Sequence, residues 1–188
     1  LIVLEILESS KFWPAINKYL IENKMLPYTE GVYSKDEMEQ AEWLTMRSKW
    51  RWEYPQPAGD GGYQHITYSE KNYCDECGSG LVQTNSFRVK KTPKWSKKNF
   101  LMLNWIDDEL FVSNNAKKIL SNSDLSGFEF IDVVKLEPDA ILEDINQLKV
   151  NSVLSPGLVD QDHTIRETTK CKKCGVVKYA ITGRGLVY

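Results

Sequence analysis

The sequence predicts an α+β fold with a mainly antiparallel sheet and a few short helices. Short apolar runs that alternate with polar residues recur along the chain, which is typical of half-buried strands. Fewer segments have apolar residues at helical spacing, and serines able to cap a helix precede them. Two motifs of the form Cys-x-x-Cys-Gly lie far apart, and each is typical of a turn that holds a metal ion. The predicted fold therefore includes a four-cysteine site built by two knuckles.

The composition predicts one globular domain over residues 1–188. Apolar residues make up 41% of the chain and charged residues 27%, which is the balance of a folded protein with a core. The net charge of -2 excludes a protein that is basic overall, so any affinity for nucleic acid needs a local basic patch. The run Leu1–Leu7 is too short to cross a membrane and is interrupted by Glu5, so we expect a strand there and no membrane association.

Four segments are predicted to be helical. Ser9 or Ser10 caps the first, which Pro27 ends, and Ser34 with Glu37 forms a capping box for the second. Ser113 caps a third that closes near Gly127. The fourth, Pro138–Val150, has apolar residues that suit a helix but could also line a buried strand, and we favour the helix. The apolar residues that define these faces are Phe12, Trp13, Ile16, Tyr19 and Leu20 in the first helix, Met38 and Ala41 in the second, Ala116, Ile119 and Leu120 in the third, and Ile141, Leu142, Ile145 and Leu148 in the fourth.

Alternating residues predict the strands. One strand is expected from Leu44 to Tyr54, where aromatic residues fall on one side and charged residues on the other. A loop rich in Pro and Gly follows it. The other predicted strands are Tyr63–Tyr68, Leu81–Val89, Phe100–Trp105, Glu109–Val112 and Phe128–Val134, with a strand on each side of the second knuckle within residues 164–188. The two knuckles are thus expected to sit in paired hairpins, residues 63–89 and residues 164–188.

The cysteines carry the clearest chemical signal in the chain. Cys74 and Cys77 precede Gly78, and Cys171 and Cys174 precede Gly175. Two intervening residues let both sulfurs of a pair face one ion at about 2.3 Å, and a glycine with positive φ turns backbone amides toward the thiolates. Four thiolates close a tetrahedral shell and leave no position for substrate or water. We therefore predict one structural Zn²⁺ held by Cys74, Cys77, Cys171 and Cys174.

Other roles for the same cysteines are less well matched by the sequence. A redox role needs one reactive pair and does not explain the matching second pair. A rubredoxin-type iron site uses the same four ligands, but it is typical of a compact electron-transfer domain, whereas here a long insert separates the pairs. Cysteines confined to CxxC pairs favour a reducing compartment over a disulfide-stapled secreted domain, which predicts a cytoplasmic protein.

A basic stretch follows the first knuckle. Its candidate binding residues for an anion or a partner are Arg88, Lys90, Lys91, Lys94, Trp95, Lys97 and Lys98. No acid occurs between Glu76 and Asp107, so this loop 88–98 could grip phosphates while Trp95 stacks on a base. A solvated loop is the simpler interpretation, and an acidic protein partner is a third one.

Signals for catalysis are thin, and we expect no enzymatic activity. His65 and His163 are the only neutral-pH bases, and neither lies in a nucleophile or metal motif. An enzyme that uses His65 would need a pocket around it. The run Asp107, Asp108 and Glu109 is expected to form a solvated turn.

The order of several motifs resembles bacterial double-CXXCG proteins. The residues that carry the likeness are Tyr73 with Cys74, Cys77 and Gly78, then Phe87 and Arg88 with Lys90 and Lys91, then Phe111, Val112 and Ser113 before a short helix, then Gly127, Phe128, Glu129 and Phe130, and finally Cys171, Cys174, Gly175 and Tyr179. Some members of that group are immunity proteins that neutralise toxins passed between bacteria. The resemblance implies a metal-binding, non-catalytic protein whose partner is a protein such as a toxin. The alternative function is a nucleic-acid-binding zinc module that uses the loop 88–98.

Overall fold

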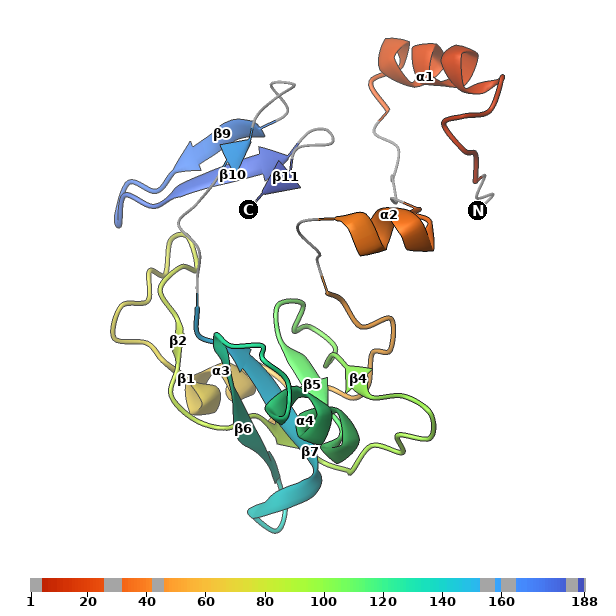
Figure 1. The fold of residues 1–188 in the computed structure, drawn as a ribbon. Helices are drawn as coiled ribbons and strands as arrows, with labels where there is room; N and C mark the ends of the chain where they lie inside the picture. The colour runs from red at the N-terminus through yellow and green to blue at the C-terminus, as the bar shows by residue number, and fades with distance from the viewer. Residues whose placement is uncertain are drawn as a thin grey trace. The chain divides into compact units, whose positions relative to one another are not determined.

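The computed structural model describes residues 5–25, 32–41, 46–152, 158–159, 165–181 and 186–187 (Figure 1). The chain divides into two units, residues 1–46 and residues 47–188, and each is described by itself. The organisation of residues 1–188 as a single domain stays a prediction. Within the described part of the chain, no helix combines the length and the apolar character needed to span a membrane.

The first unit holds two helices, α1 (Trp13–Glu22) and α2 (Lys35–Gln40), and neither buries a residue. The predicted capping box of α2 is confirmed, since Ser34 Oγ accepts from the N–H of Glu37 and a Glu37 carboxylate oxygen accepts from the N–H of Ser34. The predicted cap of α1 is wrong: its N-cap is Phe12, without a side-chain cap, while Ser10 Oγ accepts from the N–H of Phe12. The helix ends at Glu22, and Pro27 lies outside the described residues. The predicted strand 1–7 is not formed over its described residues 5–7.

The second unit is built around a five-stranded sheet with the order β3-β6-β7-β5-β4. Its strands are β3 (Arg88–Val89), β4 (Phe100–Leu101), β5 (Leu110–Val112), β6 (Phe128–Lys135) and β7 (Ala140–Val150). β3 runs parallel to β6, and the other neighbours are antiparallel. The sheet is therefore mixed, and the predicted mainly antiparallel character is confirmed only in part.

Apolar side chains pack on both faces of this sheet. Neighbouring residues of a strand point to opposite faces, so one strand can contribute to both clusters. Phe111 of β5 packs into the larger cluster, which contains Phe87, Val89, Leu101, Leu103, Ile106, Val133 and Ile145. The next residue, Val112, packs on the other face with Leu148 and with Ala116 of α4 (Asn114–Ser121). The predicted cap of α4 is confirmed, since Ser113 Oγ accepts from the N–H of Ala116. Figure 1 shows α4 in front of β5 and β7.

The remaining elements form two-stranded sheets and one short helix. β1 (Tyr68–Ser69) pairs with β2 (Val82–Gln83), β9 (Ile165–Lys170) with β10 (Val177–Ile181), and β8 (Leu158–Val159) with β11 (Leu186–Val187), all antiparallel. The helix α3 (Gly62–Thr67) precedes β1. The strands predicted on both sides of the second knuckle are thus confirmed by β9 and β10.

Four sequence-based predictions of secondary structure are wrong in this unit. Residues 140–150 form the central strand β7 and not a helix. Of the predicted strand Tyr63–Tyr68, residues 63–67 belong to α3 and only Tyr68 lies in a strand, β1. The predicted strand Leu81–Val89 is split into β2 and β3, which belong to different sheets. Of the predicted strand Leu44–Tyr54, the described residues make only an isolated bridge between Arg51 and Met102. Trp50 and Trp52 nevertheless pack against the core, as their spacing had suggested.

Candidate metal centre

The first knuckle is the turn between β1 and β2. The N–H of Gly78 donates to the carbonyl of Cys74 at 2.7 Å, and the N–H of Cys74 donates to the carbonyl of Ser79 at 2.8 Å. Gly78 has a φ of 73°, as predicted for the residue after the second cysteine. Gly80 also has a positive φ, and a Cβ there would lie 1.9 Å from the carbonyl oxygen of Asn72. The close return of the chain at Gly80 therefore excludes any side chain.

The second knuckle repeats this geometry between β9 and β10. The N–H of Gly175 donates to the carbonyl of Cys171 at 2.9 Å, and the N–H of Cys171 donates to the carbonyl of Val176 at the same distance. The φ of Gly175 is 77°. Both CxxCG motifs thus fold into the same turn, in which the glycine adopts the left-handed backbone conformation. The two sulfurs of each pair lie within 4.8 Å of each other.

The two knuckles meet, and all four sulfur atoms lie within 4.8 Å of one another. The Sγ atoms of Cys74 and Cys171 are 3.7 Å apart, and those of Cys77 and Cys174 are 3.4 Å apart. Sulfurs at the corners of a tetrahedron around an ion at about 2.3 Å are separated by about 3.8 Å. The four free thiols therefore have the spacing of a tetrahedral shell and could hold a metal ion.

The site is closed on one side and open on the other. Cys74 and Cys171 are 4% and 7% exposed, whereas Cys77 is half-buried and Cys174 is exposed. Each knuckle contributes one inner and one outer sulfur. The inner pair thus lies away from solvent, and the outer pair faces it.

Charged side chains of opposite sign join the two knuckles. The Nζ of Lys173 lies 2.7 Å from a carboxylate oxygen of Asp75, and Lys178 Nζ donates to the carbonyl of Cys77. The thiol of Cys171 lies 3.6 Å from a carboxylate oxygen of Glu76. Sequence reasoning did not single out these residues. The available signal was the contrast between Asp-Glu inside the first CxxC and Lys-Lys inside the second.

The thiols influence one another because they are so close. Hydrogen bonds from Ser79 lower the pKa of Cys77 to about 6, and contacts with Cys174 and Cys74 contribute in the same direction. The backbone N–H of Val176 acts to lower the pKa of Cys174, but the contact with Cys77 and burial outweigh it and raise this pKa to about 12. The thiol of Cys77 thus ionises readily, whereas the neighbouring thiol of Cys174 keeps its proton. A cation bound by all four sulfurs releases such protons, since the thiolate is the form that ligates metals.

Comparison with known proteins adds no family. No family model matches the chain, and no curated protein and no solved structure shows significant similarity to it. The likeness to double-CXXCG proteins therefore depends on the motifs alone.

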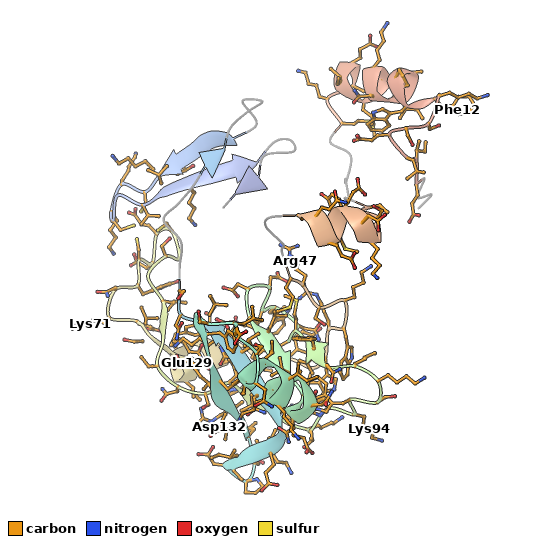
Figure 2. The ribbon with its side chains drawn as sticks, in the orientation of Figure 1. Phe12, Arg47, Lys71, Lys94, Glu129 and Asp132 are labelled. Carbon is orange, nitrogen blue, oxygen red and sulfur yellow. The ribbon has the colours of Figure 1, made fainter. Side chains whose placement is uncertain are left out.

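The basic stretch does not form a free aromatic-basic surface. The indole N–H of Trp95 donates to the carbonyl of Asp144 at 2.7 Å, and its ring packs edge-on against Trp50. Lys98 lies over the Trp50 ring, 4.4 Å from its centroid, and Arg88 of β3 pairs with Asp139 at 3.5 Å. Four further lysines of the stretch are exposed: Lys90, Lys91, Lys94 and Lys97. Figure 2 labels Lys94 among them.

The other sequence candidates are separate from the cysteines. His65 is exposed, with its Nδ1 2.5 Å from a carboxylate oxygen of Glu70, and His163 lies outside the described residues. Asp107 and Asp108 are exposed, as expected for a solvated turn. Glu109 differs, because it is half-buried and accepts a hydrogen bond from Gln147.

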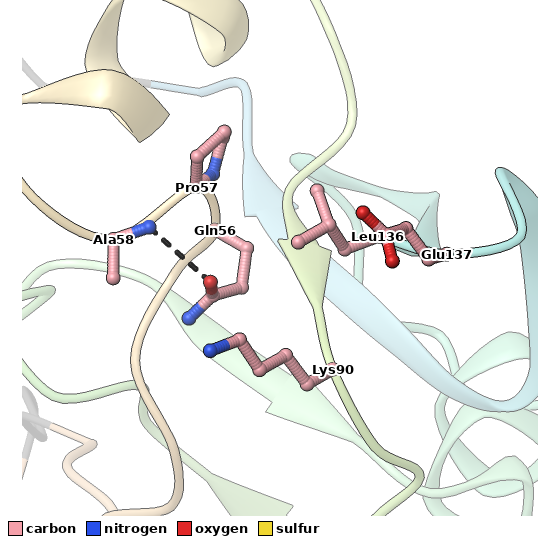
Figure 3. Close-up of a pocket in the computed structure, with 6 residues that line it drawn as sticks. All are labelled: Gln56, Pro57, Ala58, Lys90, Leu136 and Glu137. Atoms are coloured by element: carbon pink, nitrogen blue, oxygen red, sulfur yellow. Dashed lines mark hydrogen bonds between the residues drawn. The ribbon is translucent and has the colours of Figure 1, made fainter.

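One open pocket of about 530 Å³ lies between the Gln56–Ala58 turn and the end of β6 (Figure 3). Its polar lining consists of Gln56, Lys90 and Glu137, and its apolar lining of Pro57, Ala58 and Leu136. The amide of Gln56 is already used, since it accepts from the N–H of Ala58 and donates to the carbonyl of Tyr54. Of the predicted site residues only Lys90 reaches this pocket, and His65 does not line it.

Proposed function

We propose that the protein binds one structural Zn²⁺ through Cys74, Cys77, Cys171 and Cys174. The observation that carries this proposal is the spacing of the four sulfurs, all within 4.8 Å of one another. Thiolates are the ligands that structural zinc sites use most, and a shell of four leaves no open coordination position. Both knuckles also present the glycine turn that is suited to such a site.

The proposed ion would act as a clamp between distant parts of the chain. Cys74 and Cys171 are 97 positions apart, so a shared ion closes a long loop and opposes unfolding. The ionic contact between Asp75 and Lys173 supports the same closure. Binding of metal and folding of residues 165–181 would therefore be coupled.

Native mass spectrometry and elemental analysis of the purified chain test this proposal. We expect one zinc per chain, and none in either half-site variant, Cys74→Ser/Cys77→Ser or Cys171→Ser/Cys174→Ser. A Ser126→Ala variant, which changes an exposed serine elsewhere, serves as the control and should keep the metal. Metal retained by both half-site variants would exclude a shared ion. Iron in the purified chain, with strong visible absorption, would indicate a rubredoxin-type site in place of the proposed zinc site.

We further propose that the protein is non-catalytic and acts in the cytoplasm by binding a partner. A filled four-thiolate shell offers no position for substrate, and unoxidised thiols need a reducing compartment. The motif likeness to double-CXXCG proteins supports an immunity role, in which the partner is a toxin. A toxin gene beside this gene, and rescue of growth when the two are co-expressed, would support that role. Toxicity that persists under co-expression would count against it.

The second candidate is nucleic-acid binding by the loop 88–98. The four exposed lysines favour it, whereas the packing of Trp95 against Trp50 and its bond to Asp144 restrict the expected stacking platform. Phosphate contacts make affinity fall steeply with salt. Binding of a labelled oligonucleotide at low salt, lost on charge reversal of Lys90, Lys94 and Lys97, would support this candidate, and no binding at low salt would exclude it.

A further inference from the structure

Two aromatic rings lie together on the surface of the second unit, away from the cysteines in sequence. The rings of Tyr54 and Trp105 are 4.5 Å apart between centroids and tilted by 58°. Tyr54 is 43% exposed and Trp105 60%. Other aromatic side chains of the chain are equally exposed, so the informative feature here is that two such rings are in contact.

The core does not account for this exposure. The segments 50–54 and 102–106 run side by side, linked by hydrogen bonds between Trp52 and Met102 and between Met102 and Trp50. Their inward residues already fill the core: Trp52 packs against the cluster to which Leu103 and Ile106 belong. Tyr54 and Trp105 are the outward members of the same two segments.

The backbone holds the two rings in place at some conformational cost. Glu53 and Trp105 have φ values of 48° and 69°, a region that residues with a side chain rarely adopt. The carbonyl of Glu53 accepts from both the N–H and the side-chain amide of Asn104, each at 2.8 Å. One carbonyl thus ties together the two residues that precede Tyr54 and Trp105. Such local strain is often retained where a surface has to be pre-organised for binding.

Charged groups flank the rings. Arg51 pairs with Asp107, and the side chain of Asp107 is 70% exposed. Asp108 is exposed beside it. Two aspartates and one arginine give this part of the surface a net negative charge, which favours a partner of positive charge. We call the set Arg51, Tyr54, Trp105, Asp107 and Asp108 the aromatic-acidic surface.

We propose that the aromatic-acidic surface binds a basic segment of a protein partner, with an arginine or lysine side chain against the rings of Tyr54 and Trp105. A cation over an aromatic face is attracted by the ring, and Asp108 provides a carboxylate for the same cation, since Asp107 already pairs with Arg51. Tyr, Trp and Arg are also the residue types that dominate binding energy at protein interfaces. This inference extends the proposed function, since it rests on the protein acting by binding a partner.

The test uses the full chain as purified and two synthetic peptides. One peptide is acetyl-Gly-Arg-Gly-Arg-Gly-amide, and the other has citrulline in place of arginine, which removes the charge and keeps the shape. The readout is the indole N–H signal of Trp105 in an NMR spectrum, assigned by its loss in Trp105→Phe. We expect the arginine peptide to shift this signal in a saturable way and the citrulline peptide to give at least a tenfold smaller shift.

Variants of single acids sharpen the test. Asp108→Asn should weaken binding of the arginine peptide at least threefold, whereas Asp124→Asn, which changes an exposed acid elsewhere, should leave it unchanged. Equal shifts with both peptides, no shift with either, or saturation only by a thymidine hexanucleotide or by maltohexaose would overturn the proposal. Metal content measured on the same sample separates the two proposals. A chain that holds zinc but shows no shift overturns only the proposal of a binding surface. A chain without zinc that still binds the peptide overturns only the proposal of a zinc site.

Discussion

The side-chain amides of Gln83 and Gln147 donate to each other, at 2.7 and 2.8 Å. Gln83 belongs to β2, beside the first knuckle, and Gln147 is fully buried in the central strand β7. The amide nitrogen of Gln147 also donates to a carboxylate oxygen of Glu109 at 2.8 Å. This buried network connects the knuckle hairpin to the middle of the sheet, and it was not foreseen from the sequence.

We predict that Gln147→Leu destabilises the protein. Leucine fills a similar volume but leaves the Gln83 amide and the Glu109 carboxylate without their partner. An unsatisfied buried polar group costs about 1–3 kcal/mol in the free energy of unfolding. Urea unfolding followed by circular dichroism measures the effect, and Gln40→Leu on the exposed surface of α2 is the matched control. Equal stability of the two variants would mean that the network contributes nothing.

The half-buried Glu109 leads to a prediction of how the stability of the protein depends on pH. Burial raises its pKa above the ordinary 4.5, and Asp108 adds to this, while the hydrogen bond from Gln147 and the charge of Lys149 oppose it. A raised pKa means that the folded protein disfavours the ionised carboxylate, so ionisation costs stability as the pH rises above 4.5.

Glu109→Gln should therefore stabilise the protein at pH 7 and have little effect at pH 4. The amide keeps an acceptor for Gln147 and removes the charge. We expect a gain of about 1 kcal/mol or less in the free energy of unfolding, because the carboxylate is still partly in contact with solvent. Urea unfolding at both pH values checks this, with the exposed Glu129→Gln as control. A loss of stability confined to pH 7 would show that the ionised carboxylate is net favourable.

The two serine caps should differ in their effect on stability. Ser113 is buried, caps α4 and donates to Asn99 at 2.8 Å, so Ser113→Ala should lower the free energy of unfolding by about 1–2 kcal/mol. Ser34→Ala removes the capping box of α2, which buries no residue, and should leave the unfolding midpoint unchanged. Thermal unfolding of both variants measures the difference. A larger effect at Ser34 would contradict this ranking.

The Asp75–Lys173 contact should contribute to metal affinity. Lys173→Glu places a negative charge beside Asp75 and the thiolates, and we expect zinc affinity to fall by about tenfold, the low end of the roughly 10- to 100-fold loss typical of outer partners of ligands. Lys172→Glu changes the neighbouring exposed lysine and is the control. Asp75→Lys combined with Lys173→Asp should recover part of the loss. Competition with a coloured chelator measures the zinc affinities. Equal losses of affinity in Lys173→Glu and Lys172→Glu would show that only the overall charge matters, and not the contact between Asp75 and Lys173.

Local signals in the sequence were sufficient for several elements. The cysteine cluster follows from two motifs whose spacing has few other uses, and the positive φ of Gly78 and Gly175 follows from the same motifs. The cap of α4 by Ser113 and the strand β6 are likewise indicated by nearby residues. The signal for each lies within a few positions, although the cluster and the strand also require distant partners.

Elements that depend on distant packing were predicted wrongly. In β7 the residues from Ile145 to Leu148 are all buried, because this central strand is covered on both faces and therefore does not alternate. Its apolar positions happen to match helical spacing as well. The aromatic alternation around Trp50 and Trp52 was real, but strand formation also requires a hydrogen-bonding partner, and Met102 supplies only a single bridge.

The separation of the two knuckles along the chain has a consequence for biosynthesis. At about 5–20 residues per second, the ribosome needs roughly 5 to 20 s to extend the chain from Cys74 to Cys171. During that interval a nascent chain presents only two thiols, and the core strands β3 to β7 emerge before the second pair does. Capture of an ion by all four thiols would therefore follow the synthesis of the residues that form the central sheet.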